Sequence, residues 1–184
     1  MGDFAASPGV LGGLDALVIP FQQISSLILK MSTADQAALA DWVRAGKLLI
    51  VIGSDEFKTP DIDLLNSVFS FSLQKQAFCL TLDAMATLNS GAAALANTPF
   101  LTSRVPNPLA WVDRTCGLLI PSLPDNATAV YNLTTLPPPP FTSENASYVT
   151  LFKEGIGFII HLGFIFSPGT SAAAADWDTI IATS

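Results

Sequence analysis

The sequence predicts an α/β fold, a three-layer sandwich built on a mostly parallel sheet, and two observations support this class. Residues 47–52 read Lys-Leu-Leu-Ile-Val-Ile and end at Gly53, and a run that is apolar on both faces is typical of a central parallel strand. Helical patterns precede and follow this run, and strands that alternate with helices indicate βαβ units with right-handed crossovers. At 184 residues the chain is long enough to bury a core as a single domain, residues 1–184.

The N-terminal half carries the clearest elements. Residues 14–21 predict a short buried strand that ends at a proline, and residues 22–31 predict a helical turn or short helix. The next helix starts with a capping box within residues 32–36, places apolar side chains at i, i+3 and i+4 spacing, and ends at Gly46.

A further helix is predicted after the central strand, because Thr59-Pro60-Asp61 combines a cap, a proline at the first helical position and an acid in the first turn. Beyond it the periodicity weakens. Short strands are predicted at residues 118–121, 129–131, 148–152 and 157–166, and a final helix at residues 172–181.

The charge of the chain argues against two classes of partner. The net charge is −7, and the 8 Lys and Arg residues are scattered, so no basic face is available to bind nucleic acid. The longest apolar stretch, residues 155–166, is shorter than the ~20 residues that a membrane-spanning helix needs. We therefore expect neither a nucleic-acid partner nor a membrane span. The sequence also calls for no cofactor.

A cluster of Asn-X-Ser/Thr sequons favours an exported protein. Charged residues make up only 12% of the chain, about half of the ~25% that soluble proteins usually carry, so added glycans would supply hydrophilic surface. Residues 122–147 are expected to form an exposed, Pro-rich loop, and we predict glycosylation there at Asn126, Asn132 and Asn145. The segment predicted to be O-glycosylated or hydroxylated comprises Thr134, Thr135, Pro137, Pro138, Pro139 and Pro140.

The two cysteines, Cys79 and Cys116, fit the same interpretation. They form no CxxC motif and have no accompanying set of His ligands, so neither zinc nor a redox motif is favoured. A structural disulfide between them is predicted. The alternative is a pair of buried thiols in a cytosolic protein.

Three stretches of the sequence resemble class I glutamine amidotransferase-like domains. They are Leu-Asp-Ala-Leu-Val-Ile-Pro at residues 14–20, Trp-Val-Arg-Ala-Gly-Lys-Leu-Leu-Ile-Val-Ile-Gly at residues 42–53, and Gly-Ile-Gly-Phe-Ile-Ile-His-Leu-Gly at residues 155–163. Leu64-Leu-Asn66 and Phe69 follow the second stretch in the way that the family implies. The resemblance implies a flavodoxin-like, amidotransferase-like sandwich. It also implies an opening strand and helix for which residues 1–13 are too short, so we expect an incomplete sheet that another chain completes.

The resemblance does not extend to the family's catalytic residues. Those enzymes place a Cys in a Gly-X-Cys-X-Gly turn, which exposes the nucleophile, and use a His with a Glu two residues later. Cys79 has no flanking Gly, and His161 is followed by Leu162 and Gly163. We therefore expect no catalytic residue and no enzyme activity. The only histidine, His161, is interpreted as a core or edge residue bonded to backbone.

The densest group of acidic residues follows the central strand, where the loops of α/β proteins bind ligands. Several carboxylates in one loop could hold calcium, but the spacing matches no EF-hand, and the acids of the following helix are explained by capping. No metal site is therefore predicted. The weak candidates are Asp55, Glu56, Asp61 and Asp63.

The sequence favours one function over two alternatives. The first hypothesis is a non-catalytic, secreted or cell-surface glycoprotein that assembles with itself into an extracellular polymer or fibril, by adding strands at a sheet edge. The second is an extracellular module that binds carbohydrate or calcium through the acidic loop. The third is a divergent relative of hydrolases and amidotransferases.

Overall fold

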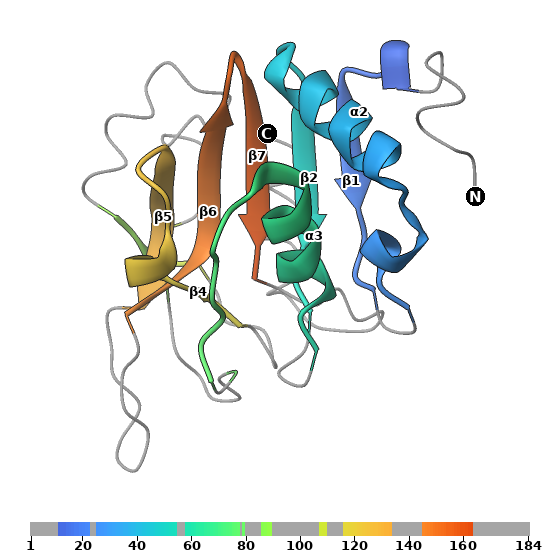
Figure 1. The fold of residues 1–184 in the computed structure, drawn as a ribbon. Helices are drawn as coiled ribbons and strands as arrows, with labels where there is room; N and C mark the ends of the chain where they lie inside the picture. Colours follow the sequence, from blue (N-terminus) through green and yellow to red (C-terminus); the bar gives the residue numbers. More distant parts are fainter. Residues whose placement is uncertain are drawn as a thin grey trace.

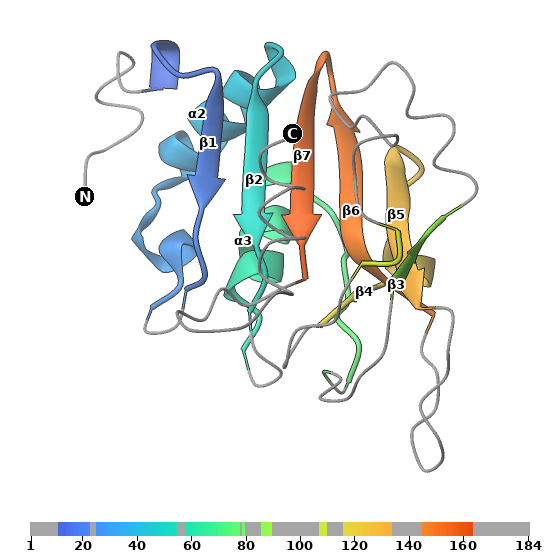
Figure 2. The same cartoon turned by 180° about the vertical axis from the view of Figure 1, so that it is seen from behind.

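The computed structural model describes residues 11–22, 25–54, 58–77, 79, 86–89, 107–109, 116–133 and 145–163. These residues form one open sheet with helices packed on it (Figures 1 and 2). The elements are β1 (Ala16–Ile19), η1 (Leu27–Lys30), α2 (Thr33–Arg44), β2 (Leu48–Ile52), α3 (Pro60–Phe69), β3 (Ala86–Leu88), β4 (Leu118–Leu119), η4 (Ile120–Ser122), β5 (Ala127–Leu133), β6 (Ala146–Glu154) and β7 (Gly157–Leu162).

The sheet has seven strands in the order β1-β2-β7-β6-β5-β3, with β4 paired to β6 off this path. Strands β1, β2 and β7 are parallel, whereas β6, β5, β4 and β3 pair in antiparallel fashion. The sheet is thus mixed, because β6 and β7 form a hairpin that reverses the chain direction. The predicted α/β class and the parallel central strand are confirmed. The antiparallel half was not anticipated.

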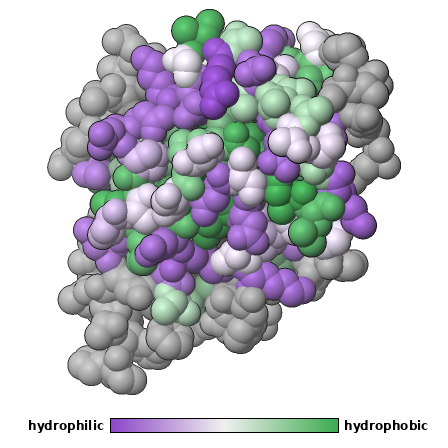
Figure 3. All heavy atoms as spheres, in the orientation of Figure 1, coloured by the Kyte–Doolittle hydropathy of each residue, from purple (hydrophilic) through white to green (hydrophobic). Residues whose placement is uncertain are grey.

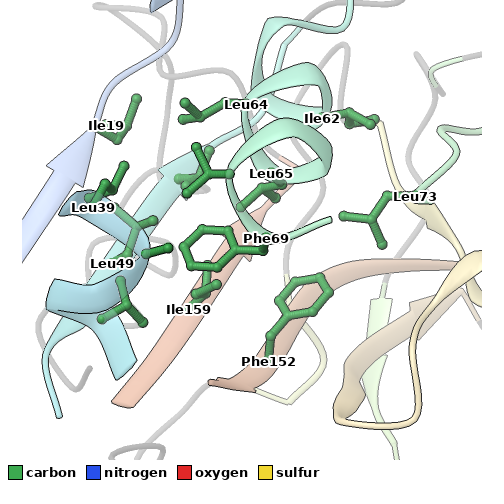
Figure 4. Packing of buried hydrophobic residues seen from close by; sticks show 14 of the residues in the cluster. Ile19, Leu39, Leu49, Ile62, Leu64, Leu65, Phe69, Leu73, Phe152 and Ile159 are labelled. Atoms are coloured by element: carbon green, nitrogen blue, oxygen red, sulfur yellow. The ribbon is translucent and has the colours of Figure 1, made fainter. Parts of the chain in front are cut away.

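Helices α2 and α3 lie side by side on one face of the parallel half (Figure 1). Their buried side chains pack on β2 and β7, where Leu49 and Ile159 point at the helices (Figure 4). Leu39, Leu65 and Phe69 come from the helices to meet them (Figure 4). Alternate strand residues such as Ile50 and Ile160 form a second core on the opposite face, as expected for strands buried on both sides. The final helix predicted at residues 172–181 lies outside the described residues.

Helix α2 follows its sequence pattern closely. Ser32 is the N-cap, and its hydroxyl accepts a bond from the backbone N–H of Asp35 at 3.1 Å. The Asp35 carboxylate in turn accepts a bond from the backbone N–H of Ser32 at 3.0 Å, which completes the predicted capping box. Gly46 follows the helix with φ 105°, a left-handed conformation that favours glycine.

Helix α3 begins at Pro60, as predicted, and ends before Ser70, which adopts the left-handed conformation with φ 59°. The side chain of Asn66 fixes the chain that leaves the helix. It accepts a bond from the backbone N–H of Leu73 at 2.8 Å and donates one to the Leu73 carbonyl at 3.1 Å. The N-terminus of α3 is therefore held against the ends of β2 and β7.

Two glycines allow backbones to approach closely. A Cβ at Gly157, the first residue of β7, would overlap the carbonyl oxygen of Val43 in α2. A Cβ at Gly163, just after β7, would overlap the carbonyl oxygen of Cys116. Both ends of β7 are therefore packed too tightly for a side chain.

The face that carries α2 and α3 shows hydrophilic side chains interspersed with smaller apolar patches (Figure 3). Large apolar side chains that are exposed among the described residues include Leu29 and Ile156. No helix in the described part of the chain is both long and apolar enough to span a membrane.

Strand β1 forms one edge of the sheet, with Val18 44% exposed. Addition of a strand from a second copy at an open edge stays a prediction.

Candidate functional site

A buried polar network lies where β2 and β7 end beneath the N-terminus of α3. His161 Nε2 is 2.8 Å from the Oδ2 atom of Asp61, although the two residues are 100 positions apart. The hydroxyl of Ser54 is hydrogen-bonded to the other carboxylate oxygen, Oδ1. His161, Asp61 and Ser54 are each 1% exposed, so the network is sealed from solvent.

Each member of this network is positioned by its element. His161 pairs in register with Val51 on the neighbouring parallel strand, and it shares the helix-facing side of β7 with Ile159. Ser54 follows β2 by two residues, and Asp61 lies in the first turn of α3. The carboxyl ends of parallel strands lie at one edge of a sheet, so residues distant in sequence meet there.

Lys75 adds a positive charge at the rim of the network. Its Nζ donates to the carbonyl oxygen of Lys58 at 2.7 Å and to the Ser54 hydroxyl at 3.3 Å. The same Lys58 carbonyl also accepts a bond from the hydroxyl of Ser54. The single hydroxyl hydrogen of Ser54 is therefore shared between Lys58 and Asp61.

The network keeps Asp61 ionised. Burial alone raises the pKa of a carboxyl, because it penalises the charged form. The hydrogen bond and charge of His161 outweigh this effect, and Ser54 and Lys75 add to it, so the pKa of Asp61 lies below its ordinary value. With Asp61 ionised, His161 Nε2 carries the proton that it donates to the carboxylate.

The second ring nitrogen of His161 is unusual. Its Nδ1 atom is buried and has no hydrogen-bond partner in the described part of the chain. An imidazole held by a carboxylate at one nitrogen, with the other unbound, resembles the base of a hydrolase. In such enzymes the imidazole lies between the serine and the carboxylate, whereas here Asp61 lies between Ser54 and His161. The geometry therefore does not activate Ser54 as a nucleophile.

A pocket of about 300 Å³ lies beside this network, between the chain that leaves β1 and the start of α3. Its lining is polar apart from one proline and carries no aromatic side chain. The lining residues are Gln22, Ser25, Ser26, Lys58, Thr59, Pro60 and Asp63. Ligands of open α/β sheets bind at this edge, and the volume is at the lower end of the range for ligand pockets.

The sequence indicated only part of this site. The acidic loop pointed to the right edge of the sheet, but not to the Asp61–His161 pair, because pairing across 100 residues depends on the strand order. His161 was expected to bond to backbone; instead it bonds to a carboxylate. Asp61 was assigned to helix capping; instead it is buried against His161.

The four weak metal candidates do not form one site among the described residues. Asp61 faces His161 and Ser54, whereas the Asp63 carboxylate accepts bonds from the Thr59 hydroxyl at 3.2 and 3.3 Å. Asp55 and Glu56 lie outside the described residues. In the described part of the chain no group of three metal-ligating side chains gathers.

Cys79 and Cys116 are joined by a disulfide that closes a loop of 37 residues. Both are buried. The disulfide lies near the end of β7, because the backbone N–H of Cys116 donates to the Gly163 carbonyl at 2.8 Å. These two are the chain's full complement of cysteines, so in this state the protein offers no thiol.

The three sequons lie in different settings. Asn126 is exposed, but its amide donates to the Lys153 carbonyl at 2.9 Å and to the Glu154 carboxylate at 3.0 Å. Asn145 is exposed just before β6. Asn132 is inside β5, and its Oδ1 atom is buried, so the folded sheet would obstruct a glycan there.

The loop predicted at residues 122–147 is not a loop throughout, because it contains β5 and the start of β6. The segment predicted to be O-glycosylated or hydroxylated, Thr134 to Pro140, lies outside the described residues.

Comparison by sequence finds no matching family model and no matching curated protein. Comparison by structure finds similar folds. The cytoplasmic protein STM1381 from Salmonella typhimurium LT2 is 11% identical, with a TM-score of 0.56 over 100% of this chain and 76% of the other.

Two further solved structures share the fold. The cytoplasmic protein STM3548 from Salmonella typhimurium is 12% identical, with a TM-score of 0.54 over 93% of this chain and 72% of the other. A protein from Thermoplasma acidophilum, provisionally named as part of a GMP synthase, is 13% identical, with a TM-score of 0.51 over 98% and 77%. The flavodoxin-like fold predicted from the resemblance is therefore confirmed.

The predicted export is contradicted by these neighbours. Two of them are cytoplasmic proteins, whereas the sequence was interpreted as a secreted or cell-surface glycoprotein that forms an extracellular polymer or fibril. That interpretation of function and location is wrong on this finding. It depended on sequons, which are short enough to arise by chance, and one of the three is built into the sheet.

Proposed function

We propose that this chain is a non-catalytic domain of amidotransferase-like fold that binds a small polar ligand. The observation that carries the proposal is the pocket of about 300 Å³ between the end of β1 and the start of α3. It occupies the edge of the sheet at which α/β proteins hold their ligands. Its polar lining suits a ligand that is recognised by hydrogen bonds.

The cysteines support the absence of amide transfer. The reaction of class I amidotransferases needs a thiolate nucleophile. Cys79 and Cys116 are bonded to each other, and Ser54, not a cysteine, is the first residue with a reactive side-chain group after β2. His161 also lacks the acid two residues later that the family uses.

The arrangement around His161 supports the absence of serine hydrolysis. A serine nucleophile needs a base that accepts its proton. The Ser54 hydroxyl instead faces the Asp61 carboxylate and the Lys58 carbonyl. The network therefore serves to hold α3 against the sheet, beside the pocket.

Two assays test the non-catalytic part of the proposal. The purified protein should release no ammonia from L-glutamine and no p-nitrophenol from p-nitrophenyl acetate above the rate of a heat-denatured sample. Turnover that is lost in a His161→Leu variant, with the variant still folded by circular dichroism, would contradict it.

Binding is tested separately by ¹⁵N–¹H correlation spectra with a library of small polar fragments. We expect saturable shifts confined to the amides of residues 22–26 and 58–63. Shifts that instead map to a distant face, or no shifts with any fragment, would refute the proposed binding function.

A further inference from the structure

The pocket wall formed by the chain after β1 offers hydrogen-bond donors. The Gln22 Oε1 atom accepts the backbone N–H of Leu27, and this bond fixes the amide so that its Nε2 group is left over. Gln22 Nε2 and Ser26 Oγ are both buried, and neither has a hydrogen-bond partner among the described residues. An unpaired buried polar group costs about 1–3 kcal/mol, and a ligand acceptor at this wall would remove that cost.

The opposite wall is the N-terminus of α3, a helix of 10 residues. Thr59 is its N-cap, yet the side chain makes no capping hydrogen bond, because its hydroxyl donates to Asp63 instead. The first turn thus lacks the usual side-chain acceptor, and the positive end of the helix dipole faces this region. Lys58 lines the same wall and adds a full positive charge.

The charges of the lining limit how negative a ligand can be. Lys58 and Asp63 are the ionised lining side chains, so the lining is neutral overall, and the whole chain carries a net charge of −7. An anion with one charge gains from Lys58 and the helix end. A second charge would meet Asp63 and the field of an acidic protein.

We propose that this pocket binds a small, singly charged oxyanion, namely a carboxylate, and the inference rests on the ligand-binding function proposed above. The Gln22 amide, the Ser26 hydroxyl and the Lys58 ammonium donate to the carboxylate oxygens, and the α3 N-terminus stabilises its charge. Asp63, on the other side, accepts from a hydroxyl or amine of the same ligand. A volume of 300 Å³ accommodates about ten non-hydrogen atoms, taking roughly 30 Å³ for a water-sized group.

The test compares acetate with acetamide, which has nearly the same shape and no charge. Each is titrated into ¹⁵N-labelled protein at constant ionic strength, together with a third titration with inorganic phosphate at pH 7.5. We expect saturable shifts at the amides of residues 22–26 and 58–63 with acetate, and binding at least about tenfold weaker with acetamide and with phosphate, which corresponds to about 1.4 kcal/mol.

Variants identify the donors. Lys58→Gln and Ser26→Ala should each weaken acetate binding by about three- to tenfold, while the matched control Lys153→Gln, an exposed lysine on β6, should leave it unchanged. Equal binding of acetamide and acetate would overturn the anion inference and leave the proposed binding function standing. Phosphate that binds more tightly than acetate would also overturn it. Absence of shifts with all three probes would overturn it too, and the fragment library then decides the proposed function independently.

Discussion

Asp61 and His161 join the first turn of α3 to the end of β7 through a 2.8 Å hydrogen bond in the protein interior. This contact couples a helix near the middle of the sequence to the last described strand. It also lies directly beside the pocket, so its integrity governs how α3 is placed against the sheet.

Removing one partner of this pair should be strongly destabilising. In a His161→Leu variant the Asp61 carboxylate stays buried without its main partner, and we expect a loss of about 3–5 kcal/mol in the free energy of unfolding. Urea denaturation followed by circular dichroism measures this loss. In the control Lys47→Gln, which breaks the 2.7 Å pair with the exposed Asp15, stability should hardly change. A His161→Leu variant as stable as the wild type would show that the pair does not hold the helix.

The same pair makes stability depend on pH. The folded-state pKa of Asp61 lies below the value near 3.8 of an unperturbed carboxyl, so its ionised form stabilises the fold. This contribution is complete well above pH 3.8, and it is lost as the pH falls through the lower folded-state pKa. Urea denaturation between pH 3 and pH 7 should show that the stability gap between wild type and Asp61→Asn is largest near neutral pH and shrinks in acid. A gap that widens in acid would reverse the assigned sign.

Gly157 should tolerate no side chain. In a Gly157→Ala variant the new methyl group would overlap the Val43 carbonyl oxygen of α2, and overpacking typically costs 1–3 kcal/mol. For a protein of this size we expect the melting temperature to fall by roughly 2–4 °C per kcal/mol. Gly12→Ala is the matched control, because nothing lies within 4 Å of a Cβ at that position. Equal melting temperatures for both variants would contradict the close packing of α2 on β7.

The disulfide should contribute measurably to stability. Cys79 and Cys116 close a loop of 37 residues, and loop-closure entropy assigns about 4 kcal/mol to such a cross-link. Wild-type protein should therefore unfold at lower urea concentration in the presence of dithiothreitol. A Cys79→Ser/Cys116→Ser variant should match the reduced wild type and be insensitive to the reductant. Titration of two free thiols in the untreated, unfolded protein would show that the bond had not formed.

The helices and the parallel strands could be predicted because their signals are local. Ser32 with Asp35 identifies the start of α2, and Pro60 identifies the start of α3. The Leu-Ile-Val run at residues 48–52 marks a strand buried on both faces, which the structure confirms. Such signals need only a few neighbouring residues.

The site could not be predicted in the same way, because it depends on long-range pairing. Nothing near Asp61 in the sequence distinguishes a helix-capping acid from one that meets His161. The choice follows from β7 lying next to β2, a neighbour relation that the sequence does not state. The sequons misled for a related reason, since the three-residue motif at Asn132 is blind to the strand that contains it.

The position of β7 also has a consequence for how the chain matures. Strand β7 lies between β2 and β6, so the middle of the sheet is made by one of the last described segments to leave the ribosome. Until then β1 and β2 have no neighbour to seal their apolar surfaces, and nascent chains of this topology depend on delayed, post-translational collapse. Protease protection of ribosome-bound chains should thus rise abruptly once the β6–β7 hairpin emerges, rather than growing in steps along the first half of the sequence.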